Sequence, residues 1–151
     1  MDYTVETYVQ QSDLSYLKTD TATRSGVYGS SVSVEPAQAE EGYFPDMEKS
    51  VLSATLAEGT VLKVYYSLEY GTVTVQRGGS AVEVLVYTGG IVTDAEGKII
   101  EDYSSFALTE DGEGQYYFWN IGGEIVRRGL TKNDFVTLGS GTIVEQAEAV
   151  Q

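Results

Sequence analysis

The sequence of 151 residues contains no cysteine and no histidine. Without cysteine, disulfide bonds, thiol nucleophiles and thiolate metal sites are excluded. Without histidine, the chain lacks the commonest general base and the commonest ligand of transition metals. Catalysis by Ser-His-Asp or Cys-His arrangements is therefore excluded. Paired carboxylates need a cleft for glycoside hydrolysis, and small β domains offer little cleft. We therefore predict that the protein is not an enzyme and has no catalytic residues.

Positive charge is scarce, with 9 Lys and Arg against 23 Asp and Glu, for a net charge of −14. Residues 1–70 carry 4 positive and 11 negative side chains, and residues 71–151 carry 5 and 12, so the acidity is spread evenly. A negative surface repels phosphate, which argues against nucleic acids and anionic membranes as partners. Such a surface also favours solubility.

The sequence has no apolar run of 18 residues, so we predict no insertion into a membrane. Met1 leads directly into an alternating strand pattern, which is not typical of a signal peptide. If the protein is exported, we expect the sequence to be a mature fragment.

Only two prolines are present, whereas the 17 glycines and 12 tyrosines are numerous. Glycine is typical of tight turns, and β-branched and aromatic residues suit a pleated, half-buried surface. No window longer than about 12 residues keeps the helical period of 3.6. The sequence therefore predicts an all-β fold with at most one short helix. That helical turn is expected at 36–41, where Pro36 begins it and Gly42 ends it.

A junction is expected at 68–70, and it divides the chain into two small domains, 1–70 and 71–151. Strands separated by turns at intervals of 8–12 residues predict a sandwich or barrel. The segment 60–66 is apolar on both faces, which indicates a central strand. The second domain is predicted to be a small β-sandwich or barrel. Its expected strands are 71–76, 81–88, 91–93, 98–100, 106–108, 115–121, 124–128, 135–138 and 142–145.

The densest aromatic segment lies in the predicted strand 115–121 and contains the candidate binding residues Tyr116, Tyr117 and Trp119. In a strand, Tyr116 and Phe118 face one side, and Tyr117 and Trp119 face the other. An exposed aromatic set would stack on a sugar or form a protein interface. The alternative is a central strand that is buried on both faces.

Two predicted hairpins carry carboxylates that are candidate metal ligands: Asp94, Glu96, Glu110, Asp111 and Glu113. A structural Ca²⁺ ion takes six to eight oxygen ligands, and these side chains would supply some of them if the loops meet. Neither loop has the spaced Asp-x-Asp-x-Asp-Gly pattern. The alternative is a pair of solvated hairpin tips, and no other cofactor is expected. Arg127 and Arg128 are expected to pair with local carboxylates.

Residues 1–70 resemble a known module through four motifs in a fixed order. These are Tyr3-Thr-Val-Glu-Thr-Tyr8, Gly26-Val-Tyr-Gly-Ser-Ser-Val32, Gly42-Tyr43-Phe44 and Gly59-Thr-Val-Leu-Lys-Val-Tyr-Tyr66. Their order is similar to that of the mucin-binding-protein (MucBP) type repeat, which is related to the B repeats of internalins. Such repeats stand in tandem on exported surface proteins of Gram-positive bacteria.

This resemblance implies a ubiquitin-like β-grasp module, a secreted or cell-wall location, and a role in adhesion, protein interaction or spacing within a stalk. It implies a protein or glycan ligand without naming it, and tandem repeats in the parent chain. It also implies a core that contains Val5, Val32, Val51, Val61 and Val64, with Tyr65 or Tyr66 at its end. Two other functions stay open: a structural assembly protein, such as a phage tail or fibre component, and a carbohydrate-binding domain centred on Tyr117 and Trp119.

Overall fold

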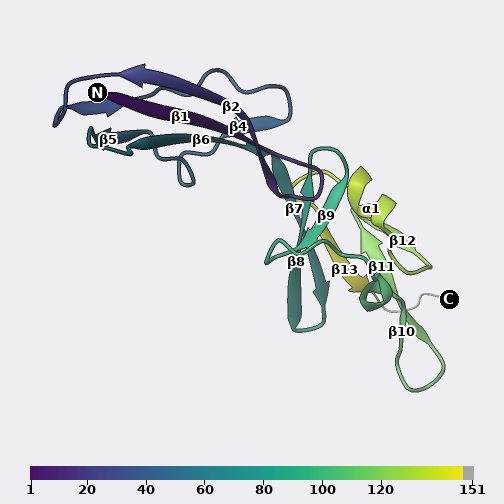
Figure 1. Ribbon diagram of the computed structural model, residues 1–151. Coiled ribbons are helices and arrows are strands. Elements are labelled where there is room, and N and C mark those ends of the chain that lie inside the picture. The colour runs from purple at the N-terminus through teal and green to yellow at the C-terminus, as the bar shows by residue number, and fades with distance from the viewer. Residues whose placement is uncertain (148–151) are drawn as a thin grey trace. The chain divides into compact units, whose positions relative to one another are not determined.

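The computed structural model describes residues 1–147 and consists mostly of β-strands (Figure 1). About 50% of these described residues lie in strands and 6% in helices, and they include one short α-helix. The all-β fold predicted from the sequence is therefore confirmed. The chain divides into two compact units, Met1–Glu69 and Tyr70–Gln151, which we call the first and the second unit.

The first unit contains a four-stranded sheet in the order β2-β1-β6-β4. Strand β1 runs antiparallel to β2 and parallel to β6, and β4 runs antiparallel to β6. The predicted central strand therefore lies between two neighbours. Strands β3 and β5 form a separate two-stranded pair. The bounds are β1 Asp2–Gln10, β2 Tyr16–Ser25, β3 Ser31–Ser33, β4 Tyr43–Pro45, β5 Ser53–Thr55 and β6 Val61–Leu68.

The core of the first unit follows from the alternation of side chains along these strands. Its buried members are Tyr3, Val5, Val32, Val34, Leu56, Leu62 and Val64, with Tyr66 packed against them. Two valines expected in this core lie outside it, since Val51 is 46% exposed and Val61 is 37% exposed. Val51 is the bridge partner of Lys63, and Val61 precedes Lys63 by two positions. Both therefore share the outer face of the sheet with that lysine.

The helical turn expected at 36–41 is absent, because residues 34–40 adopt no regular secondary structure. The hydroxyl of Tyr66 donates a hydrogen bond of 2.9 Å to the carbonyl oxygen of Ala37, which a helix would pair with an amide four residues later. So short a segment also lacks the length to offset the cost of helix nucleation. The sequence signal of Pro36 followed by alanines and glutamates was therefore overridden by tertiary contacts.

In the second unit, hydrogen bonds join seven strands into one sheet in the order β10-β11-β13-β7-β8-β9, with β12 paired to β11. The bounds are β7 Tyr70–Arg77, β8 Ser80–Tyr87, β9 Ile91–Asp94, β10 Thr109–Glu110, β11 Tyr116–Ile121, β12 Glu124–Val126 and β13 Ile143–Ala147, with a 3-10 turn η1 at Ser104–Phe106 and helix α1 at Lys132–Thr137. The core combines side chains of the sheet with Phe106 of η1 and Phe135 of α1. The sequence predicts a sandwich or a barrel for this unit. In the described residues, η1 and α1 instead supply core side chains that pack with those of the sheet.

The segment predicted as a strand at 135–138 instead forms the second half of helix α1 and its C-cap residue, Leu138. The carboxylate of Asp134 accepts hydrogen bonds from the backbone amide of Thr131, at 2.7 Å, and from its hydroxyl, at 3.1 Å. This arrangement satisfies a backbone amide at the start of the helix, as in a capping box. Phe135 and Leu138 lie three positions apart, and both pack in the core. The Thr-x-x-Asp signal that precedes Phe135 therefore outweighs its β-branched and aromatic neighbours.

We expect the substitution Gly71→Ala to lower the free energy of unfolding of the second unit by about 1–3 kcal/mol, because it overpacks a tight contact. A Cβ atom at Gly71 in β7 would lie 2.6 Å from Cβ of Ser140. Gly79 is the control, since a Cβ atom there meets nothing within 4 Å. Urea unfolding of both alanine variants measures the difference. Equal midpoints for the two variants would contradict the close approach of Ser140 to β7.

Candidate functional site

The outer face of the sheet in the first unit carries three tyrosines that contact one another. Tyr8 of β1 is the register partner of Tyr65 in the parallel strand β6, and their rings stack with centroids 4.6 Å apart. Tyr16 of β2 meets the ring of Tyr65 edge-on, with centroids 5.3 Å apart. Val5 and Val64 point to the opposite face, into the core. Aromatic pairs in these geometries are favourable beyond the area they bury.

Two lysines lie over these rings, and a third, Lys18 of β2, is the register partner of Tyr8. The Nζ atom of Lys49 lies 4.6 Å from the ring centroid of Tyr16 and 5.6 Å from that of Tyr65. The Nζ atom of Lys63 lies 5.9 Å from the ring centroid of Tyr8. Ammonium groups at such distances are attracted by the ring quadrupole. We call the area formed by these side chains the tyrosine–lysine surface; its members are Glu6, Tyr8, Tyr16, Lys18, Lys49, Lys63 and Tyr65.

Glu6 is the one carboxylate among these residues. It accepts hydrogen bonds from the Lys18 ammonium at 3.1 Å and from the Tyr8 hydroxyl at 3.0 Å. The hydrogen bond from Lys18 lowers the pKa of Glu6, and the one from Tyr8 lowers it further. Residues 1–69 contain four cationic side chains, Lys18, Arg24, Lys49 and Lys63, so three of the four gather here. These seven residues therefore carry three positive charges and one negative charge on an acidic chain, and the carboxylate of Asp46 lies beside them, hydrogen-bonded to Ser67.

A chain of polar contacts holds Lys49 in place. The Tyr16 hydroxyl donates to Oγ of Ser67 at 2.6 Å, and the Ser67 hydroxyl donates in turn to Oδ2 of Asp46 at 2.7 Å. Oδ1 of Asp46 accepts a hydrogen bond from the backbone amide of Lys49 at 3.1 Å. Oγ of Ser50 accepts from the backbone amide of Tyr65 at 2.9 Å. The turn that carries Lys49 is thus tied to the sheet beneath it.

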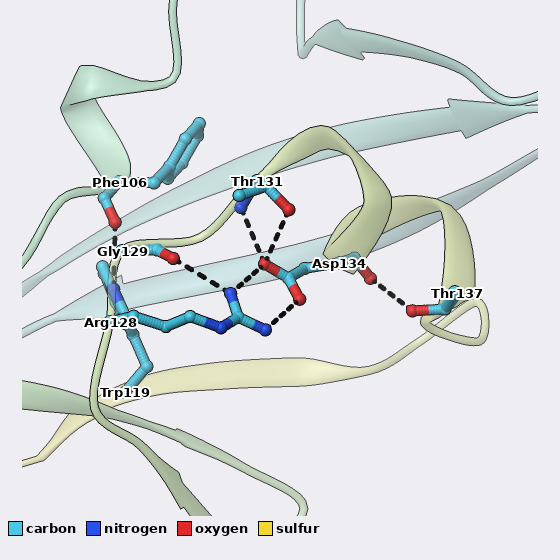
Figure 2. Close-up of polar contacts among 7 residues, drawn as sticks. All are labelled: Phe106, Trp119, Arg128, Gly129, Thr131, Asp134 and Thr137. Carbon is cyan, nitrogen blue, oxygen red and sulfur yellow. Dashed lines mark hydrogen bonds and ion pairs between the residues drawn. The ribbon is translucent and has the colours of Figure 1, made fainter.

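The structure separates the three aromatic residues predicted to bind a ligand in the second unit. Trp119 is 1% exposed, and its Nε1 atom donates a hydrogen bond of 3.0 Å to the carbonyl oxygen of Phe106 (Figure 2). The guanidinium of Arg77 lies 4.7 Å from its ring centroid. Tyr116 is 45% exposed, and Tyr117 is half-buried. The candidate platform of Tyr117 and Trp119 is therefore corrected, because Trp119 is a core residue.

The predicted metal ligands of the second unit lie in two hairpins, where Asp94 and Glu110 are the last residues of strands β9 and β10 and the other three lie in the turns. Oδ1 of Asp94 accepts from the backbone amides of Glu96 and Lys98, at 2.9 and 3.0 Å. Oδ1 of Asp111 accepts from the amides of Glu113 and Gln115, at 2.7 and 3.2 Å. Such bonds are typical of aspartates that close turns. Within residues 1–147, no three acidic side chains come together in a way that would hold a metal ion. A Ca²⁺ site formed by these residues and Glu110 therefore stays a prediction.

Arg128 pairs with a local carboxylate, as the sequence predicts. Two nitrogens of its guanidinium donate to the two carboxylate oxygens of Asp134, at 2.7 and 2.8 Å (Figure 2). These bonds, together with those from Thr131, lower the pKa of Asp134 from 3.8 to about 2, against the opposing effect of desolvation. The pair joins the segment after β12 to the first turn of α1.

We expect the stability of the second unit to depend on pH through Asp134. A carboxylate with a lower pKa in the folded state stabilises the fold above its unfolded pKa, and this contribution is lost as the pH falls toward the folded pKa. Between about pH 4 and pH 2, the free energy of unfolding should fall by about 1–2 kcal/mol from this group. The lower figure allows for solvent screening, because the side chain of Arg128 is 58% exposed.

Urea unfolding of the wild type and of Asp134→Asn, at several values across that pH range, measures this contribution. The asparagine variant should lose part of the pH dependence, while the contributions of all other carboxylates remain common to both proteins. Parallel pH profiles for the two proteins would contradict the assignment.

The sequence by itself does not predict the tyrosine–lysine surface. A usable signal exists, because Glu6 and Tyr8 alternate with core residues in one strand and Lys63 and Tyr65 do so in another. Recognising it requires knowing that these two strands are neighbours.

Among the described residues, no helix has both the length and the apolar character needed to cross a membrane. In comparisons with known proteins, no family model matches the chain, and no curated protein or solved structure matches it either.

Proposed function

We propose that the protein is a non-enzymatic module of a secreted or cell-surface bacterial protein that acts in adhesion, in protein interaction or as a spacer in a stalk. The observation that carries this proposal is the strand order β2-β1-β6-β4 with a parallel central pair, β1 and β6. A β-grasp sheet has its first and last strands parallel at the centre and a hairpin partner at one side. This order supports the resemblance of the first unit to MucBP-type repeats.

One feature of the first unit departs from a β-grasp module, since its described residues include no helix. The segment that connects β3 to β4 lies over the inner face of the sheet instead. It leaves a groove lined in part by Val9 of β1, by Ala37 and Ala39 of that segment, and by Tyr66 of β6. The proposal therefore concerns a variant of the module with an irregular cover.

The modular part of the proposal rests on the separate cores. The first unit has one cluster of buried apolar side chains, and the second unit has another. Chains built of small β units in series are suited to spacing and display. The non-enzymatic part rests on the composition, which lacks histidine and cysteine. The interaction part rests on the tyrosine–lysine surface, because aromatic side chains are enriched where proteins bind partners.

Detection of the protein on intact cells tests this proposal. An antibody raised against the chain should label intact cells of the organism that produces it, or find the protein in the culture medium, and external protease should remove the label. A cytoplasmic protein of the same cells is the control and should be labelled only after lysis. Labelling that requires lysis would overturn the proposal. Gel filtration is the complementary measurement, because a discrete trimer or hexamer would favour the structural assembly protein.

A further inference from the structure

The tyrosine–lysine surface has a charge opposite to that of the chain as a whole, whose net charge is −14. We propose that this surface is the docking site for an acidic peptide segment of a partner protein, with carboxylates that bind Lys49 and Lys63. The inference rests on the proposed function and deepens it, since it names the chemical class of the partner.

The ammonium groups of Lys49 and Lys63 can donate hydrogen bonds to a partner. Lys18 forms an ion pair with Glu6, but within residues 1–147 neither Lys49 nor Lys63 has a carboxylate oxygen within 4 Å of its Nζ atom. Their ammonium groups lie over the faces of tyrosine rings. A ring face attracts the charge of an ammonium but accepts no conventional hydrogen bond from it. Carboxylates supplied by a partner would form charge-assisted hydrogen bonds at both positions.

The arrangement of the rings favours a peptide over a saccharide. A sugar stacks on an open aromatic face, whereas Tyr8 and Tyr65 are stacked on each other with an interplanar angle of 10°. Lys49 lies over the ring of Tyr16 and also near that of Tyr65, and Lys63 lies over Tyr8. The groups directed toward a partner are therefore ammonium donors, one on strand β6 and one on the turn that follows β4. An extended chain with several carboxylates fits such donors.

The acidity of the remaining chain makes the site selective. A long polyanion that extends beyond the surface meets a repulsive field, while a short acidic segment placed on the lysines does not. Binding should weaken as the salt concentration rises, because Lys49 is exposed and Lys63 is only half-buried, so dissolved ions screen both charges. The contacts from Asp46 through Ser67 to Tyr16 are already in place without a partner. The partner therefore meets an ordered surface, and the cost of fixing these side chains on binding is reduced.

Titration of the full chain with a short synthetic peptide of alternating glutamate and glycine tests the inference, with calorimetry and amide chemical shifts as readouts. The double variant Lys49→Glu, Lys63→Glu should bind at least tenfold more weakly than the wild type. The control is the double variant Lys98→Glu, Lys132→Glu, which makes the same change in net charge at two exposed lysines of the second unit. It should stay within about twofold of the wild type, since long-range repulsion is screened.

Circular dichroism tests whether each variant is folded. If the double variant Lys49→Glu, Lys63→Glu is unfolded, the double variant Lys49→Gln, Lys63→Gln replaces it. Four outcomes would overturn the inference: no binding by the wild type, an equal loss in the control variant, binding of a polyuronate but not of the peptide, or self-association that the first variant abolishes. The last two would assign the surface to a glycan or to a second copy of the chain. A protein exposed on intact cells that binds no acidic peptide would leave the spacer role standing, so the two failures are distinguishable.

Discussion

Replacing Trp119 by alanine is expected to lower the free energy of unfolding of the second unit by about 3–5 kcal/mol. The side chain is 1% exposed and belongs to the core cluster with Phe106 and Phe135. Its removal leaves a large cavity, removes one donor to the carbonyl oxygen of Phe106 and takes away the ring beneath Arg77. The variant Trp119→Phe keeps most of the apolar volume and should lose less, about 1–3 kcal/mol, because it leaves a smaller cavity and removes one of two hydrogen bonds to this carbonyl oxygen. The backbone amide of Leu130 remains as the other donor, at 3.0 Å.

Urea unfolding followed by far-ultraviolet circular dichroism measures these losses. Tyr116→Ala is the matched control, because it removes an aromatic ring from the same strand at a position that is 45% exposed. That variant should change the stability by no more than about 0.5 kcal/mol, as is usual for surface positions. Unchanged stability of Trp119→Ala would indicate that this side chain is exposed, and it would support the carbohydrate-binding hypothesis.

The substitution Leu62→Ala is expected to lower the free energy of unfolding of the first unit by about 2–5 kcal/mol and to leave the second unit unchanged. Leu62 is 0% exposed and packs in the core cluster that contains Val5 and Leu56. Its side chain contributes nothing to the core cluster of the second unit. Two units with separate cores should therefore respond separately.

The composition provides a direct way to observe this. Trp119 is the single tryptophan of the chain, so tryptophan fluorescence reports on the second unit, whereas circular dichroism reports on both. In Leu62→Ala the fluorescence midpoint should stay at its wild-type value, while part of the dichroism transition shifts to lower urea. Val61→Ala is the control, because its side chain lies on the outer face of the same strand. A fluorescence midpoint that moves with Leu62→Ala would show that the units unfold together.

Local patterns in the sequence predicted much of the fold. Alternation with a period of two identified the long strands, because side chains point to opposite faces at every step of a strand. The segment Asp94-Ala-Glu-Gly97 predicted a hairpin with glycine at the turn, and Gly97 has a φ of +84°. The prediction of a strand at 135–138 was wrong. Four residues are too few for the spacing of apolar side chains to distinguish a strand from a helix. The helix cap at Thr131 and Asp134 was the better signal.

The sequence by itself determined that this chain has no imidazole or thiol and that it folds into strands. The absence of a residue type can be read from the sequence alone, and a period of two depends only on residues that are close together in the chain. The tertiary structure alone decided which faces these strands bury. It placed Trp119 in the core, and it paired β1 with β6 so that Tyr8, Tyr65 and Lys63 share one surface, which the turn after β4 supplements with Lys49. Strand pairing joins residues that are distant in the chain, and no local pattern carries that information.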